Sequence, residues 1–168
     1  MTVRRATEPD ARMLAAIYNY YVVNTASTFE TEPVDTSTIA SRMREKLERH
    51  DWLVGDVDGR LVGYAYYGSF RSRPAYGHTV ESTVYVDPGE IGKGYGRQLY
   101  AALMSSAAAK GFVQAVGFIS LPSPASVALH RSLGFEEAGL LRAIGYKFDR
   151  YIDVAIYQRA LTSAATSA

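Results

Sequence analysis

Cysteine is absent from the 168-residue chain, so disulfides, thiolate metal sites and a cysteine nucleophile are all excluded. Histidine is scarce, and the three that occur, His50, His78 and His130, stand far apart in the sequence. Long apolar runs are also missing: no stretch approaches the roughly 18 residues of a membrane span, and no apolar run follows the arginines near the N-terminus. We therefore expect a cytoplasmic protein that binds neither a metal nor a membrane.

The chain also lacks an excess of charge of one sign. Its 18 Lys and Arg residues stand against 17 Asp and Glu residues, a formal net charge of +1, which does not favour a nucleic-acid partner. With 48% hydrophobic and 21% charged residues, the composition is that of a folded globular protein. The length favours one domain, which we place at residues 1–161, followed by a flexible tail of alanine, serine and threonine at residues 162–168.

Hydrophobic spacing and end signals predict four helices. The first follows a capping-box-like pair, Thr7 and Asp10, and the second follows a cap at residues 36–37. The third stops at Gly111, and the fourth has Ser123 as its N-cap, followed by a proline. The expected helices extend to residue 21, over 38–49, over 97–110 and from 124 to 132.

Alternating and β-branched runs predict the strands. Residues 52–57 and 61–67 flank Asp58-Gly59, a dipeptide typical of tight hairpin turns, so these two strands should pair antiparallel. Further strands are expected at 79–86, 113–119 and 152–157, with extended structure from Phe135 onward. Within strand 79–86, Glu81 shares a face with Tyr85. The order of elements predicts a mixed sheet with helices on its faces, in an α/β or α+β fold.

A glycine-rich turn connects strand 79–86 to the third helix. Gly92, Gly94 and Gly96 would let the backbone approach a ligand closely, and the helix N-terminus would attract a phosphate or pyrophosphate, reinforced by Lys93 and Arg97. The spacing fits neither a P-loop nor a dinucleotide-binding fingerprint. A tight strand-to-helix connection without a ligand is the alternative reading of these glycines alone.

Further motifs favour a ligand-binding turn over a connection without a ligand. The strand, the Gly-x-Gly-x-Gly turn and the helix, followed by ALHRSLGF at residues 128–135, resemble the GNAT acetyltransferases, whose ligand is acetyl-CoA. Blocks at residues 4–8, 31–33, 52–54, 79–86, 121–122, 141–142 and 145–147 are similar to phosphinothricin and methionine sulfoximine N-acetyltransferases. The resemblance covers nearly the whole chain and implies the GNAT fold, with a mixed, mostly antiparallel central sheet and helices on both faces.

The resemblance also implies an acetyl-CoA site. The residues that it assigns to this co-substrate are Val84, Tyr85, Val86, Gly92, Lys93, Gly94, Tyr95, Gly96, Arg97 and Ser123. Two positions depart from the family pattern, because Ile91 stands where Gln or Arg is usual and Ser123 where Asn is usual. We expect Ile91 to weaken the binding of acetyl-CoA without abolishing it, since backbone amides and the helix dipole remain. Ser123 keeps a hydroxyl with a shorter reach.

Acetyl transfer to an amine requires a neutral amine, and a carboxylate in an apolar strand can take the proton because burial raises its pKa. A lone Glu in a strand is otherwise solvent-facing or ion-paired, but the resemblance assigns the general base to Glu81. The resemblance also places His130 near the CoA sulfur as an acid, although a thiol leaves with little help. The alternative is a histidine with a capping or surface role. In the family, a main-chain N–H of residues 84–86 faces the developing oxyanion where the sheet splays.

The loop at residues 69–78 is basic and aromatic and would border the acceptor site. Arg71 and Arg73 could grip a carboxylate or phosphinate, and Tyr76 with the distant Phe29 could form an apolar wall. A solvated loop with a few charges is the alternative. The basic character favours an anionic acceptor over a polycation such as an aminoglycoside.

We interpret the chain as an N-acetyltransferase that moves acetyl from acetyl-CoA directly to the free α-amine of a small amino-acid analogue. A covalent acyl-enzyme has no obvious carrier, because no Cys and no nucleophile-elbow Ser occur. The alternatives are a GNAT enzyme for another amine, such as a protein N-terminus or an aminoglycoside, and a CoA-binding module without turnover. A homodimer is expected, since relatives are usually dimers and interfaces favour the residues of the aromatic stripe Tyr146, Phe148, Tyr151 and Tyr157.

Overall fold

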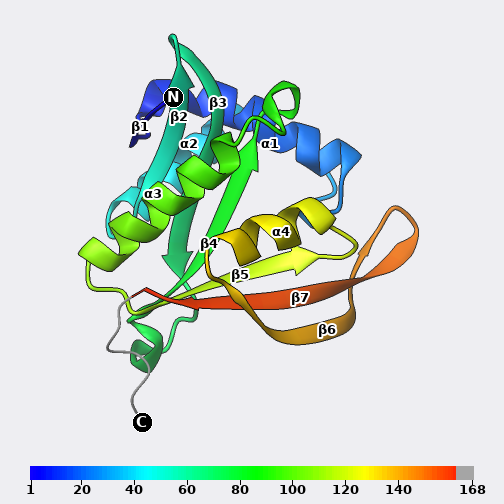
Figure 1. The fold of residues 1–168 in the computed structure, drawn as a ribbon. Coiled ribbons are helices and arrows are strands. Elements are labelled where there is room, and N and C mark those ends of the chain that lie inside the picture. Colours follow the sequence, from blue (N-terminus) through cyan, green and yellow to red (C-terminus); the bar gives the residue numbers. More distant parts are fainter. Residues whose placement is uncertain (162–168) are drawn as a thin grey trace.

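The computed structural model describes residues 1–161, and their seven strands form one sheet in the order β1-β2-β3-β4-β5-β7-β6 (Figure 1). Only β4 and β5 pair in parallel among these strands, so the predicted mixed, mostly antiparallel sheet is confirmed. The strands are β1 (Thr2–Arg5), β2 (Trp52–Val57), β3 (Arg60–Ser69), β4 (Thr79–Val86), β5 (Gln114–Ser120), β6 (Glu136–Lys147) and β7 (Arg150–Ala160).

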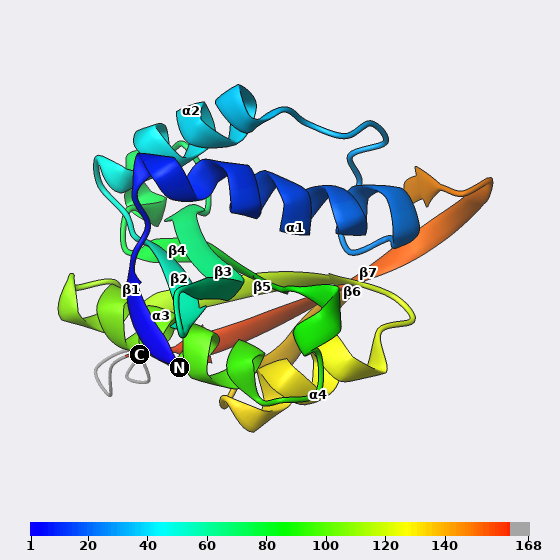
Figure 2. The same cartoon turned by 90° about the horizontal axis from the view of Figure 1, so that it is seen from above.

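Four α-helices cover the two faces of this sheet within residues 1–161. They are α1 (Ala11–Asn24), α2 (Thr36–Leu47), α3 (Tyr95–Ala109) and α4 (Pro124–Ser132). Figure 2 shows α1 and α2 on one face, here called the α1/α2 face, and α3 and α4 on the other, the α3/α4 face. Each face has its own apolar core, one around Leu14, Ile39 and Trp52 and the other around Leu99 and Leu103. The helices on both faces agree with the expected fold.

Local signals account for most element ends. Thr7 and Asp10 form the predicted capping box, in a 3₁₀ turn that leads into α1. Asp58 and Gly59 have φ of 53° and 83°, as a tight hairpin between β2 and β3 requires. The predicted cap of α2 at residues 36–37 was wrong, because the side chain of Asp35 accepts from the Thr38 N–H.

The sequence did not predict the start of α3 or the range of β1. α3 begins at Tyr95 instead of residue 97, after Gly94 as a left-handed N-cap with φ of 81°. No residue range was predicted for β1, whose four residues carry two arginines and give too short a pattern to distinguish a strand from a loop. Its strand conformation depends on antiparallel pairing with β2.

The parallel pair β4 and β5 separates soon after it begins. Thr79–Glu81 pair with Gln114–Val116, and the remaining parts of the two strands run apart (Figure 1). Because β4 stays paired with β3 along residues 80–86, the separation opens a gap between β4 and β5 in the middle of the sheet. This is the splaying that the family resemblance implied.

Two further sequence predictions can be compared with the structure. Tyr157 does not belong to an exposed aromatic stripe, because it is buried in the α3/α4 core, whereas Tyr146, Phe148 and Tyr151 are exposed. The predicted flexible tail, residues 162–168, lies outside the described residues. Over residues 1–161, no helix is long and apolar enough to cross a membrane.

Candidate active site

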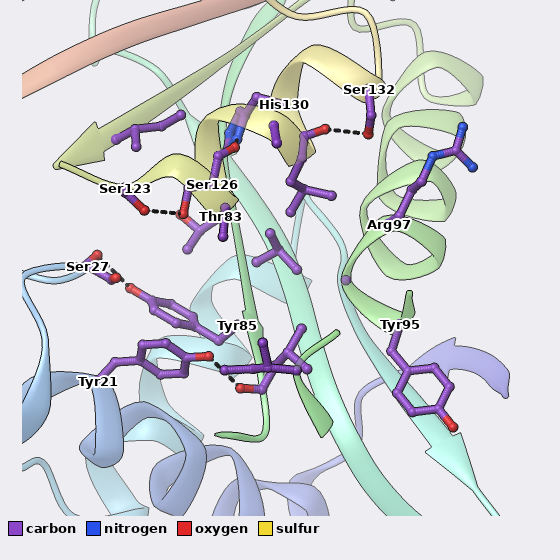
Figure 3. A pocket seen from close by; sticks show the side chains of 18 of the residues that line it. Tyr21, Ser27, Thr83, Tyr85, Tyr95, Arg97, Ser123, Ser126, His130 and Ser132 are labelled. Carbon is purple, nitrogen blue, oxygen red and sulfur yellow. Dashed lines mark hydrogen bonds between the residues drawn. The ribbon is translucent and has the colours of Figure 1, made fainter. Parts of the chain in front are cut away.

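A cavity of about 620 Å³ lies where β4 and β5 part (Figure 3). Five consecutive residues of β4, Ser82 to Val86, line it, together with the start of α3, the end of β5 and one side of α4. Successive strand residues point to opposite faces of a sheet, so a cavity lined by five in a row has walls on both faces. The cavity therefore extends through the sheet.

The glycine turn forms the end of this cavity beside α3. Gly92 and Gly94 have φ of 87° and 81°, in the left-handed region that favours glycine, and no atom lies within 4 Å of a Cβ built on either of them. Gly96 packs closely instead, since its Cβ would stand 3.2 Å from Val86. Open space before a left-handed turn at a helix N-terminus fits a pyrophosphate, as the sequence predicted.

The two basic side chains of the turn differ in their surroundings. Arg97 lines the cavity, and Figure 3 shows its side chain on α3. Lys93 is not among the residues that line the cavity, and its Nζ donates to Glu90 at 2.9 Å. Glu90 is buried and also pairs with Arg60, and the hydrogen bonds from Arg60 and Lys93 lower its pKa. Lys93 thus anchors the turn in this structure.

Backbone groups of β4 face the gap. The N–H of Asp87 donates to the carbonyl of Val62, and the carbonyl of Thr79 accepts from the N–H of Phe70. The backbone groups of the odd-numbered residues in β4 therefore point toward β3. Val84 and Val86 therefore direct their N–H and C=O groups toward the gap. The Val86 carbonyl accepts from the Tyr21 hydroxyl at 2.6 Å, and Val84, whose N–H faces the gap, is among the residues that line the cavity.

His130 lines the cavity from α4 and belongs to a buried hydrogen-bond chain. Its Nδ1 lies 2.8 Å from the Ser126 carbonyl and its Nε2 lies 3.1 Å from the Tyr100 hydroxyl, which lies 2.8 Å from Ser82 Oγ. Burial lowers the pKa of His130, which favours the neutral ring. A carbonyl only accepts, so Nδ1 carries the hydrogen and Nε2 accepts from Tyr100.

Ser123 stands at the N-cap position of α4, as predicted, followed by Pro124. Its hydroxyl donates to Ser126 Oγ at 2.9 Å instead of capping a backbone N–H (Figure 3). Both serines line the cavity, as do Tyr85, Tyr95 and Ile91. Ile91 is 58% exposed, so the position that departs from the family pattern contributes an apolar side chain at the mouth.

Glu81 is the last β4 residue paired with β5, directly below the gap. It is half-buried on the α1/α2 face, where its neighbour Thr83 lines the cavity, although Glu81 itself does not. Burial raises the pKa of Glu81, and the positive charges of Lys46 and Arg71 partly oppose that shift. A half-buried carboxyl group with a raised pKa therefore lies beside the cavity.

Comparison with known proteins agrees with this geometry. The model of the acetyltransferase (GNAT) domain matches residues 3–156. The chain belongs to the GNAT acetyltransferase family. It is 40% identical over 157 residues to phosphinothricin N-acetyltransferase of Streptomyces viridochromogenes, covering 94% of this chain and 86% of that relative. It is 36% identical over 166 residues to the L-methionine sulfoximine/L-methionine sulfone acetyltransferase of Salmonella typhimurium, covering 98% and 97%.

A solved structure gives the same result for this GNAT acetyltransferase. A phosphinothricin acetyltransferase from Sinorhizobium meliloti in complex with acetyl-CoA superposes with a TM-score of 0.95 at 37% identity, covering 99% of this chain and 91% of that one. The family, the fold and acetyl-CoA as co-substrate are therefore confirmed. The roles assigned to single residues stay predictions.

The residues predicted to bind the acceptor do not line the cavity of this acetyltransferase. Arg71 lies over the ring of Phe70 and close enough to Glu81 to lower its pKa, and Tyr76 packs against Phe70. Arg73 is exposed in the same loop. The ring of Phe29 packs on Gly145 in β6. The loop carrying Arg71 adjoins Glu81, whereas Phe29 adjoins the β6–β7 hairpin.

Sequence reasoning missed the buried partners of His130. Tyr100 and Ser82 carry no motif, and their helical or strand spacing indicates only a core position. Gly117 gave no signal either, yet a Cβ there would stand 2.6 Å from Nε2 of His130. These contacts bring together β4, β5, α3 and α4, which are distant in sequence.

Proposed function

We propose that this chain transfers acetyl from acetyl-CoA directly to the α-amine of a small amino-acid analogue of the phosphinothricin or methionine sulfoximine type. The observation that carries the proposal is the gap between β4 and β5. It connects the glycine turn on one face with the neighbourhood of Glu81 on the other, so two substrates can approach one point from opposite sides. The names of the relatives agree with this class of acceptor.

In this proposal Glu81 is the general base. An α-amine is mostly protonated at neutral pH and must lose a proton before it attacks. Glu81 stands at the edge of the gap with a raised pKa, which brings its basicity closer to that of the amine. Acetyl-CoA supplies the activated acyl group, and the N–H of Val84 is a fixed donor for negative charge on the acyl oxygen.

His130 takes the role of the acid that protonates the leaving thiolate. Its Nε2 accepts from Tyr100 in the resting protein, so the acid role requires that the ring first take up a second proton from solvent, which its lowered pKa opposes. A thiol has a pKa of about 8.5 and leaves without much assistance. We therefore expect loss of His130 to slow turnover less than loss of Glu81.

The test is release of thiol from acetyl-CoA with purified protein and a panel of amines: phosphinothricin, methionine sulfoximine, an aminoglycoside and a peptide with a free N-terminus. The proposal expects turnover with an amino-acid analogue that collapses in Glu81→Gln. Turnover with the peptide or the aminoglycoside alone would replace the acceptor class. Binding of acetyl-CoA without turnover on any amine would favour a CoA-binding module.

We also infer a homodimer formed through the β6–β7 hairpin. β6 is an edge strand of the sheet, and the hairpin exposes apolar side chains at Ile144, Tyr146, Phe148 and Tyr151, with exposed fractions of 50–72%. Because Phe29 packs on Gly145 beside this surface, a dimer would bring the partner close to Phe29, one of the predicted acceptor residues. A monomeric mass by light scattering at working concentration would contradict the dimer.

A further inference from the structure

Gly68 in β3 is the cross-strand partner of Glu81 in β4. Directly paired residues of an antiparallel pair project to the same face, with Cβ atoms about 4.5–5.5 Å apart. Gly68 has no side chain, and the space is taken by the ammonium of Lys46 from α2, whose Nζ lies 2.7 Å from where a Cβ would stand. The ammonium of Lys46 therefore occupies the side-chain position opposite Glu81.

The position of Lys46 is supported by its other contacts. Its Nζ lies 5.2 Å from the centre of the Tyr66 ring, a cation–π arrangement, and its side chain is half-buried near the end of α2. Within residues 1–161, no ion pair up to 4 Å joins Lys46 to an acidic side chain. A half-buried cation thus stands close to the Glu81 carboxylate without being paired with it.

This arrangement matches the charges of an α-amino acid. Such a molecule carries an ammonium and a carboxylate on one carbon. The site offers the carboxylate of Glu81 and, in the space over its cross-strand partner Gly68, the ammonium of Lys46. We propose that Lys46 binds the acidic group of the acceptor and selects amines that carry a carboxylate or a similar anion beside the amine. The inference rests on the proposed function and adds a specificity-determining residue to it.

Arg71 is the other cation close to Glu81, but it differs in how it is held. It sits on the exposed loop after β3, stacked on Phe70, whereas Lys46 extends from a helix into a space left by a glycine. A fixed ammonium discriminates between anionic and neutral acceptors, because binding a neutral one leaves the half-buried charge without a counterion. A rival explanation is that Lys46 acts only on the pKa of Glu81.

The experiment compares Lys46→Met with the wild type on two acceptors that share the same amine, methionine sulfoximine and its methyl ester. We expect the KM for the free acid to rise about 10- to 100-fold, as for the loss of a charge-assisted hydrogen bond, with little change for the ester. Lys46→Arg should restore much of the preference. Arg49→Met removes a nearby exposed charge and serves as the matched control.

Each other outcome is decisive. An equal change in KM for acid and ester, or only an upward shift of the acid limb of the pH profile, would mean that Lys46 acts through Glu81, and the proposal fails. Equal wild-type activity on acid and ester would also overturn it while leaving acetyl transfer to amino-acid analogues intact. If the wild type acetylates neither, the proposed function fails, and calorimetric binding of the acid to wild type and Lys46→Met still decides the role of Lys46.

Discussion

On the α3/α4 face of β4, the site is built from backbone amides, glycines and hydroxyl groups that bind one another, as in the chain from Ser82 through Tyr100 to His130. On the α1/α2 face, it is built from charged side chains that stand close together without pairing, namely Glu81, Lys46 and Arg71. The chain from Ser82 to His130 has its hydrogen bonds satisfied within the protein. The second set has charges left for a ligand to satisfy.

This difference between the two faces indicates how one fold can bind the same co-substrate in every member while the acceptor changes. Backbone donors at a helix N-terminus recognise a pyrophosphate with little dependence on side chains, so we expect a change such as Ile91 to be tolerated there. Recognition of the acceptor depends on a few side-chain charges, and one substitution can change it. Substitutions on the two faces should therefore separate effects on acetyl-CoA from effects on the amine.

Glu81→Gln should have the largest effect. Without a base the amine stays protonated, and kcat should fall by about 10²- to 10⁴-fold, as is usual for loss of a general base. The Kd of acetyl-CoA, measured by calorimetry, should not change, because Glu81 lies outside the cavity lining. Glu45→Gln, an exposed residue of α2, is the control.

The same residue predicts a pH dependence. The active form of Glu81 is deprotonated, and burial raises its pKa, so kcat/KM should increase with pH through an acid limb that lies above the usual range of a glutamate. Glu81→Gln should lose this limb. A limb that persists in Glu81→Gln would assign it to another group.

Gly117→Ala should disturb the α3/α4 face. The added Cβ would stand 2.6 Å from His130 Nε2 and 3.3 Å from the Tyr100 hydroxyl, so the buried chain has to move. We expect a loss of about 1–3 kcal/mol in the free energy of unfolding, measured in urea, together with weaker binding of acetyl-CoA. Gly139→Ala is the control, because its nearest contact would be at 3.9 Å.

Tyr100→Phe tests the same chain without adding volume. It leaves His130 Nε2 and Ser82 without their shared partner in a buried site, which should cost about 1–2 kcal/mol of unfolding free energy. The ¹⁵N chemical shifts of His130 should also show a smaller population of the tautomer that carries its hydrogen on Nδ1. Tyr20→Phe, at an exposed tyrosine, should change stability by less than about 0.5 kcal/mol.

Ile91→Gln should have the smallest effect, and in the opposite direction. A polar side chain at the mouth of the cavity can add a hydrogen bond to the co-substrate, so the affinity for acetyl-CoA should rise by up to about tenfold. Calorimetric titration measures the change. If the wild type already binds at least as tightly as Ile91→Gln, the apolar side chain does not weaken the site.

The sequence alone determined the features that depend on neighbouring residues. The hairpin at Asp58-Gly59, the capping box of Thr7 and the glycine turn before α3 were all predicted, because backbone conformation and capping are decided within a few residues. The family resemblance added the acetyl-CoA turn and the importance of Glu81 and His130. The range of β1 was missed because four residues give too short a pattern, and the Asp35 cap of α2 because three adjacent residues, 35–37, are all of types that cap helices.

Only the tertiary structure decided which side chains meet. The gap between β4 and β5 depends on strands that are separated by the 27 residues from 87 to 113, and no periodicity shows where their pairing ends. The approach of Lys46 to the position opposite Glu81 depends on α2 packing over a glycine of β3, and the burial of Tyr157 on α3 and α4 covering it. Contacts of this kind join residues that are far apart in the sequence. They depend on how the helices pack on the sheet, which no short stretch of sequence determines.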